Sequence, residues 1–245
     1  MPDLTMKNGN LNVKAASGYQ FSAVSTDDLE ACEYTLVGIA CDVSSSVSNF
    51  KSEMEDCLAE IVKTCKYSPR ADNLMLRFVQ FASDVHETHG FKPLVTINEK
   101  DYQNILNVGG CTALYDASYT LTESLIDYGR ILDDEDYDVN AILFIITDGC
   151  DNSSRYNPKS LKKLKDRVLK EESLESLLIV LIGVDTNGSI SKELNDFKNK
   201  AELDQFVDIG DANPKNLAKL ASFVSQSISS QSQALNSGSS AILSF

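Results

Sequence analysis

Five oxygen-bearing side chains, spread over three short polar segments, have the chemistry of a site for a hard metal ion. The first segment holds Asp42, Ser44 and Ser46, the second holds Thr112, and the third holds Asp148. Carboxylate and hydroxyl oxygens are the ligands that Mg²⁺, Mn²⁺ and Ca²⁺ prefer, whereas softer metals prefer sulfur or imidazole nitrogen. One residue separates the two serines, so both side chains can face one point in an extended turn.

The sulfur and imidazole side chains, in contrast, do not have the spacing of a metal site. The six cysteines include no Cys-x-x-Cys pair, and the only histidines are His86 and His89. Structural zinc sites commonly draw their ligands from such pairs. We therefore expect six reduced cysteines, and we place both histidines in a surface loop.

The polar segments follow elements of regular structure. Residues 34–41 form a continuous apolar run, as a strand buried on both faces requires, and apolar residues then recur at helical spacing over 50–65. The same patterns predict further strands at 73–81, 87–93, 141–147, 177–183 and 205–209, and further helices at 101–106, 114–126, 158–172, 190–201 and 214–229.

This alternation of buried strands and amphipathic helices predicts an α/β fold. We expect a Rossmann-like, doubly wound, mostly parallel central sheet with helices on both faces. In such open sheets the functional site lies outside the carboxyl ends of the strands. The three polar segments are therefore expected to meet there.

The three segments together resemble the von Willebrand factor A (VWA) family, in its stand-alone intracellular form. The resemblance covers about residues 34–229. The motifs that carry it are Asp42-x-Ser44-x-Ser46, Thr112 within Gly-Gly-Cys-Thr-Ala-Leu-Tyr-Asp-Ala, and Ile-Ile-Thr-Asp148-Gly.

The resemblance implies a metal-ion-dependent adhesion site (MIDAS). Ser44, Ser46 and Thr112 would bind one Mg²⁺, or Mn²⁺ or Ca²⁺, through their hydroxyls. Asp42 and Asp148 would act partly through water and supply negative charge. In the family, a vacant metal position accepts a Glu or Asp side chain from a partner protein.

Four residues flank the expected ligands and are predicted to form the rim that a partner contacts: Ser45, Cys111, Cys150 and Asp151. The cysteines either fill space at this rim or make the site sensitive to redox state. Asp151 either faces the partner or forms a turn. Asp116 is expected to cap or pair locally on its own helix.

Charge and length exclude several other classes of function. Acidic residues number 36 and basic residues 22, which gives a net charge of −14 and disfavours nucleic acid and anionic membrane as partners. The apolar runs are much shorter than a membrane span, and the polar first twenty residues contain no apolar core of a secretion signal. We therefore expect a cytoplasmic protein.

The composition divides the chain into three parts. Residues 1–33 show no sustained period and form an N-terminal arm or an edge hairpin. Residues 34–230 form the VWA domain. Residues 231–245 are rich in serine and are expected to be a flexible tail.

The leading functional hypothesis is a protein-binding adaptor without catalysis. Its partner would be an AAA+ ATPase or a component of a stress or resistance system. A Mg²⁺-dependent phosphatase of the haloacid dehalogenase type is the enzymatic alternative, although Ser44 stands where that class has a second Asp. The third alternative is a fold of this type whose metal site is unused.

Overall fold

Nine strands of the described chain form one sheet, in the order β1-β2-β3-β6-β5-β4-β7-β8-β9. The computed structural model describes residues 3–7, 10–171 and 173–234. The strands are β1 (Asp3–Lys7), β2 (Asn10–Lys14), β3 (Gln20–Val24), β4 (Glu33–Asp42), β5 (Leu74–Phe81), β6 (Val85–Pro93), β7 (Asp138–Thr147), β8 (Ser176–Gly183) and β9 (Gln205–Asp208).

The centre of the sheet is parallel and apolar. β5, β4, β7, β8 and β9 pair in parallel, while β6 runs antiparallel to β5. The interior strands β4, β5 and β7 are buried on both faces along almost their whole length. The predicted α/β fold with a mostly parallel central sheet is therefore confirmed.

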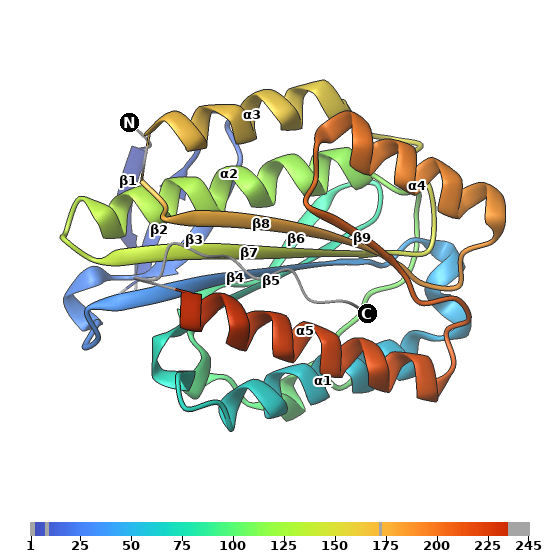
Figure 1. Ribbon diagram of the computed structural model, residues 1–245, viewed down its shortest axis with the longest axis horizontal. Coiled ribbons are helices and arrows are strands. Elements are labelled where there is room, and N and C mark those ends of the chain that lie inside the picture. Colours follow the sequence, from blue (N-terminus) through green and yellow to red (C-terminus); the bar gives the residue numbers. More distant parts are fainter. Residues whose placement is uncertain (1–2, 8–9, 172, 235–245) are drawn as a thin grey trace.

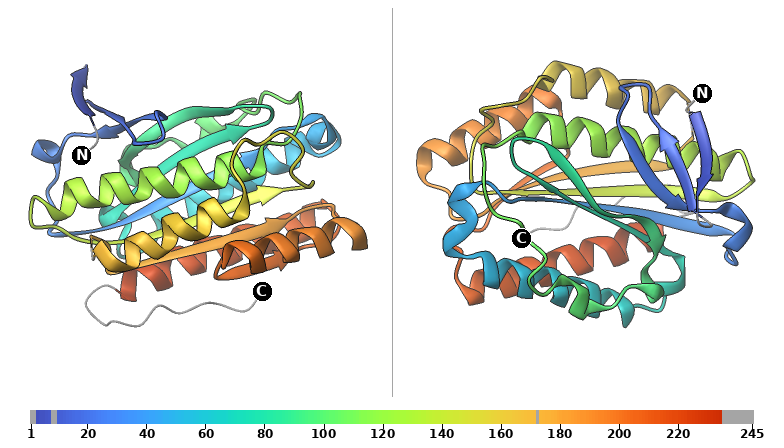
Figure 2. Two further views of the ribbon diagram at one scale, coloured as in Figure 1. Left: turned by 90° about the horizontal axis from the view of Figure 1, so that it is seen from above. Right: turned by 180° about the vertical axis from the view of Figure 1, so that it is seen from behind.

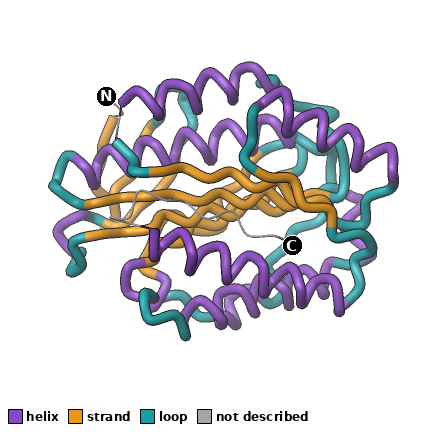
Figure 3. The backbone as a smooth tube through the Cα atoms, viewed as in Figure 1, coloured by secondary structure: helices purple, strands orange, loops and turns teal. Residues whose placement is uncertain are grey.

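Helices cover both faces of this sheet, as Figure 1 and Figure 3 show. α2, α3 and α4 lie on one face, and α1 and α5 lie on the other. Within the described residues, no helix has the length and apolar character needed to cross a bilayer. The helices are α1 (Lys51–Lys66), α2 (Leu114–Asp133), α3 (Pro158–Glu171), α4 (Gly188–Ala201) and α5 (Pro214–Ala234).

The N-terminal residues extend the sheet at the β6 edge. β1, β2 and β3 form an antiparallel meander, and β3 meets β6 through Ala23 and Phe91. Figure 2 shows this meander beside the β5–β6 pair. The sequence did not decide whether the N-terminal segment is an arm or an edge hairpin. Its strands β1, β2 and β3 are part of the central sheet.

A fully buried arginine holds the meander in place. The Arg77 guanidinium of β5 donates to Tyr19 Oη at 2.8 Å and to Ser124 Oγ of α2 at 2.7 Å. It also pairs with Glu87 of β6 at 2.9 Å. Glu87 in turn accepts from the backbone N–H of Ser22 at 3.1 Å. One buried charge is therefore satisfied by groups from the meander, the sheet and a covering helix.

Two local predictions were wrong. His86 and His89 lie in strand β6 instead of a loop, and His89 Nε2 hydrogen-bonds Tyr102 Oη at 2.7 Å. Burial lowers the pKa of His89 to about 4, so this side chain is a neutral packing residue at pH 7. The helix predicted at 101–106 is only a 3₁₀ turn at Glu99–Tyr102.

The tail boundary predicted at residue 230 lies inside α5, which continues to Ala234. Gln231 is fully buried, and its Nε2 donates to Ser176 Oγ at 2.7 Å. Its backbone carbonyl accepts from Asn140 Nδ2 at 2.6 Å. The polar composition of this segment was misleading because these polar groups have partners in the core. Residues 235–245 of the predicted tail lie outside the described residues.

Replacing Gly90 by Ala tests how tightly the meander meets β6. A Cβ at this position would lie 2.0 Å from the backbone oxygen of Ser22, so either β3 or β6 must shift. We expect Gly90→Ala to lower the free energy of unfolding by about 1–3 kcal/mol in chemical denaturation. The control is Gly188→Ala at the start of α4, where a Cβ meets no atom within 4 Å. Equal stability of the two variants would contradict this close packing.

Candidate metal centre

The first and third polar segments leave the sheet side by side. β4 ends at Asp42 and β7 ends at Thr147, and the register pairs Cys41 with Ile146. These carboxyl ends lie at the right-hand side of Figure 1. Thr147 Oγ1 donates to Asp42 Oδ2 at 2.6 Å, which joins the two segments directly.

The two serines of the first segment face each other. Their hydroxyl oxygens, Ser44 Oγ and Ser46 Oγ, lie 3.1 Å apart. The backbone N–H of Ser44 donates to Asp42 Oδ1 at 2.8 Å, so the aspartate shapes its own loop. Ser44 precedes the 3₁₀ helix η2 (Ser45–Asn49) without a capping bond from its side chain. Its hydroxyl is therefore directed to its neighbour instead of to the helix.

Two glycines bring the second segment against the first. Gly109 and Gly110 have φ values of +157° and +89°, and the second is a conformation that side chains disfavour. The backbone N–H of Gly109 donates to Val43 O at 2.8 Å, and that of Ser45 donates to Gly110 O at 3.3 Å. The turn thus carries the buried Thr112 to the carboxyl edge of the sheet.

Thr112 is also tied to the third segment. Its backbone N–H donates to Asn152 Oδ1 at 2.8 Å, and its carbonyl accepts from the Asn152 N–H at 3.0 Å. A Cβ added at Gly149 would lie 3.9 Å from Thr112 Oγ1, so the hydroxyl lies beside the residue that follows Asp148. The structure thus gathers all five predicted ligand residues at one place.

The two carboxylates of this site are buried without a compensating charge. Asp42 is 2% exposed and Asp148 is 8% exposed. Neither forms an ion pair with a basic side chain in the part of the chain that the structure describes. Burial raises the pKa of Asp42 to about 6, against hydrogen bonds from Thr147 and Ser44. Burial also raises the pKa of Asp148.

One oxygen of the site is left without any partner. Asp148 Oδ1 is fully buried and accepts no hydrogen bond. An unsatisfied buried acceptor costs about 1–3 kcal/mol, which a cation beside it would offset. A divalent cation fits this donor set. Two carboxylates and three hydroxyls are hard oxygen ligands, and the cation would supply the positive charge that the carboxylates lack nearby. Elsewhere in the described chain no group of three or more His, Cys, Asp or Glu offers a second metal site.

The predicted rim residues differ in how far they face outward. Ser45 and Cys111 are exposed, whereas Cys150 and Asp151 are half-buried. Asp151 Oδ1 accepts from the Tyr115 N–H at 3.2 Å, so it supports the start of α2. Burial and the Glu193 carboxylate raise the pKa of Cys150 to about 12, so it is a thiol at neutral pH. All six cysteines are free.

Three supporting residues were not predicted in their observed roles: Thr147, Asn152 and Asp116. Asp116 was expected to act locally, but its Oδ1 accepts from the backbone N–H groups of Arg155 and Tyr156 at 2.9 and 2.8 Å. It therefore anchors the loop that follows Asp148 to α2. No sequence pattern announces such bonds, because each joins residues that are far apart in the chain.

No protein-family model matches the chain, and no curated protein matches it. Solved structures do resemble it. Proximal thread matrix protein 1 from the mussel byssus has 20% sequence identity and a TM-score of 0.52, over 82% of this chain and 47% of that protein. One structure of the byssus protein, with a TM-score of 0.50, has a zinc-occupied MIDAS motif.

Two further structures resemble the chain at lower identity. The pilus adhesin SpaC from Lactobacillus rhamnosus GG has 10% identity and a TM-score of 0.58, over 94% of this chain and 34% of that one. The ArnB paralog VWA2 from Sulfolobus acidocaldarius has 13% identity and a TM-score of 0.53, over 92% of this chain and 52% of that one. The chain thus spans about half or less of each of these structures. It has the VWA fold.

Replacing Asp42 by Asn tests whether the buried negative charge destabilises the metal-free protein. A pKa raised from 3.8 to about 6 means that ionisation opposes folding, by up to about 3 kcal/mol at pH 7. We expect Asp42→Asn to stabilise the metal-free protein by 1 to about 3 kcal/mol at pH 7. The difference in free energy of unfolding between the variant and the wild type should shrink as the pH falls from 6 towards 4, because Asp42 of the folded wild type then becomes protonated.

The measurement is thermal and chemical denaturation of both proteins in chelator across this pH range. Asp134→Asn, in an exposed loop at the other end of α2, is the control and should be neutral. A destabilised Asp42→Asn variant at pH 7 would contradict this account of the site.

Proposed function

We propose that the chain is a metal-dependent protein-binding module that captures a carboxylate of a partner protein. The observation that carries the proposal is the pair of buried carboxylates, Asp42 and Asp148, without a basic partner in the described chain. Their charge favours a cation, and the hydroxyls around them complete a set of hard oxygen ligands.

Each residue has a separate task in this proposal. Ser44, Ser46 and Thr112 would hold the cation through neutral oxygens, and Asp42 and Asp148 would offset its charge. A cation held largely by neutral ligands stays electrophilic enough to attract one more carboxylate. Thr147 and the Ser44 N–H fix both oxygens of Asp42, which keeps that carboxylate from turning away.

The metal is proposed to be Mg²⁺, with Mn²⁺ and Ca²⁺ as alternatives. The oxygen-only donor set supports this choice. The zinc in the MIDAS motif of the byssus protein supports binding of a divalent cation at a site of this kind. Zn²⁺ therefore belongs among the ions to be compared.

The predicted partner and location are part of the same proposal. We infer a cytoplasmic adaptor, and the six free thiols support a reducing compartment. The partner is proposed to offer a Glu or Asp, whether it is an AAA+ ATPase or a component of a stress or resistance system.

Phosphatase chemistry receives less support from the geometry. The residue two positions after Asp42 is Ser44, whose hydroxyl faces Ser46 Oγ instead of acting as an acid. Asp42 itself accepts two hydrogen bonds and is almost fully buried, so its oxygens are poorly placed for attack on a phosphate. We therefore propose a binding function without catalysis.

The test is calorimetric titration of Mg²⁺, Mn²⁺, Ca²⁺ and Zn²⁺ into the chelator-treated protein. We expect one site in the wild type, and loss of at least about 10-fold in affinity for Thr112→Ala and Asp42→Asn. Asp134→Asn serves again as the control. Binding that is unchanged in both site variants would refute the proposed ligand set.

Partner capture is measured separately, by affinity capture from a lysate of the source cells with Mg²⁺ or with chelator. A specific partner should be retained with Mg²⁺ by the wild type and by Asp134→Asn. It should be lost in chelator and in Asp42→Asn. A partner that is retained equally under all four conditions would show that the metal centre is not the binding site.

A further inference from the structure

Helix α3 has a charge opposite to that of the whole chain. It contains six basic and two acidic residues, a formal charge of +4, whereas the chain carries −14. The remaining residues therefore carry −18. The first turn of α3 has no acidic residue, although a helix N-terminus favours negative charge. Helix stability alone does not explain this composition.

The lysine side chains that the structure describes in α3 fall into two groups. Lys162 pairs with Asp166 at 3.1 Å and Glu202 at 2.9 Å, and Lys165 pairs with Asp204 at 2.8 Å. These two lysines fasten α3 to the end of α4. Lys159 and Lys163, in contrast, form no hydrogen bond or ion pair with any described residue, and both are exposed.

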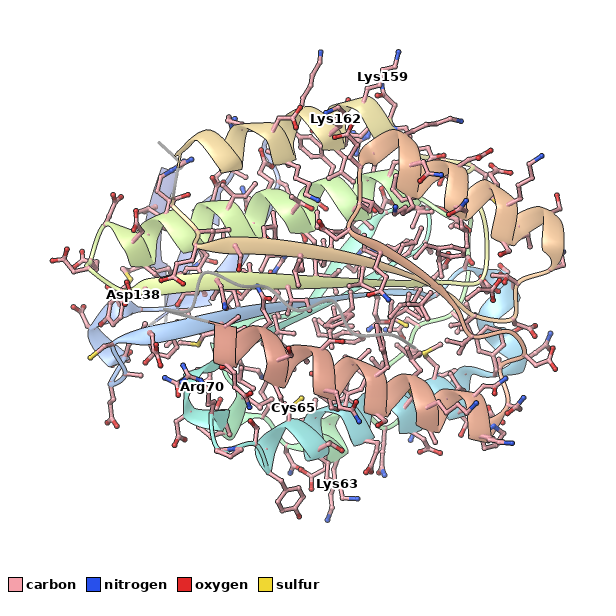
Figure 4. The ribbon with its side chains drawn as sticks, viewed as in Figure 1. Lys63, Cys65, Arg70, Asp138, Lys159 and Lys162 are labelled. Carbon is pink, nitrogen blue, oxygen red and sulfur yellow. The ribbon has the colours of Figure 1, made fainter. Side chains whose placement is uncertain are left out.

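Lys159 and Lys163 lie in line with a third basic residue, Arg167, along one side of the helix. Lys159, Lys163 and Arg167 follow one another at intervals of four residues, so they share one face and span about 12 Å. We call these three residues the α3 basic stripe. Figure 4 shows Lys159 on the outer side of α3, away from the sheet.

Hollows flank the stripe on both sides. One of about 800 Å³ is lined by Lys159, Lys163 and Lys200, on the side of α4. Another of about 290 Å³ is lined by Lys163 and Arg167, together with Tyr119 and Tyr156. Those two tyrosine rings stack 3.9 Å apart at 8°, which makes a flat apolar wall beside the cations.

The loop that follows Asp148 connects the metal centre to the stripe. It runs from the end of β7 to Pro158 at the start of α3. Asn152 ties its first part to Thr112, and Asp116 ties Arg155 and Tyr156 to α2. Because this loop is pinned at both ends, the stripe has a fixed position relative to the metal centre.

We propose that the α3 basic stripe binds an acidic segment of the same partner protein whose carboxylate reaches the metal. This inference rests on the proposed function and names the class of partner. One Glu or Asp would approach the metal centre, and further acidic side chains of the segment would pair with Lys159 and Lys163. The stripe is a basic region on a strongly acidic molecule, so charge complementarity favours an acidic segment as the bound partner.

An acidic protein segment suits the surface better than a nucleic acid. The −18 charge of the remaining chain repels a dense line of phosphates, which would have to pass over it. Asp166 and Glu202 also line the larger hollow. A peptide can place neutral residues opposite these acids, whereas each nucleotide brings a phosphate.

The test uses fluorescence anisotropy with two labelled probes in Mg²⁺ at low salt. One probe is octaglutamate, and the other has the same length but keeps one Glu among Gln residues. We expect the double variant Lys159→Gln/Lys163→Gln to bind octaglutamate about 5-fold more weakly than the wild type. Its binding of the single-Glu probe should be unchanged, and the difference for octaglutamate should fade at high salt.

The matched control is Lys215→Gln/Lys219→Gln on α5, where two exposed lysines have the same spacing on the opposite face of the sheet. It should behave as the wild type. The proposal is overturned if the α3 variant binds octaglutamate as the wild type does, or if octathymidylate binds more tightly than octaglutamate and depends on the same lysines.

Failure of the metal proposal gives a different result. If chelator and Asp42→Asn leave octaglutamate binding intact while the α3 variant weakens it, the stripe is correct and carboxylate capture by the metal is wrong. Sedimentation of the protein alone tests a second copy as the occupant. Self-association that is lost in the α3 variant would overturn the assignment to a different partner protein.

Discussion

The burial of two carboxylates without a counter-charge is the constraint on which the rest of the site depends. Asp42 and Asp148 end up together because β4 and β7 are neighbouring parallel strands whose carboxyl ends coincide. Such burial costs several kcal/mol unless a cation or hydrogen bonds offset it. Asp42 has two hydrogen bonds, but Asp148 Oδ1 has none. A fold that retains this arrangement is organised to receive positive charge.

Hydrogen bonds join the loops around the carboxylates to one another. Ser45 and Gly109 link the first two loops, and Asn152 links the second to the third. Asp116 then holds the far part of the third loop against α2. These bonds fix the oxygens before any ligand arrives, which reduces the ordering that binding requires. They also hold the loop that connects the centre to the start of α3.

The sequence predicted the elements that depend on local pattern and missed those that depend on distant pairing. The apolar runs of β4, β7 and β8 and the helical spacing of α1 were sufficient to place the sheet, its helices and the five candidate ligands at one edge. Thr147 reaches Asp42, 105 residues away in the chain, and Asn152 reaches Thr112, 40 residues away. Gln231 was assigned to a flexible tail because its buried partners, Asn140 and Ser176, are also distant in the chain. His89 is polar in sequence but packs as an uncharged ring.

The candidate metal centre and an exposed acidic loop lie at opposite ends of strand β7. The metal centre lies at one end of β7, and the other end begins at Asp138, after the exposed acidic residues 133–136. Figure 4 places Asp138 at the end of the molecule opposite the carboxyl edge of the sheet. The net charge of −14 therefore opposes the approach of an acidic partner, whereas α3 and a loaded metal centre attract it. Because these two attractive regions are joined by one pinned loop, they favour a single orientation of the partner, which neither would specify alone.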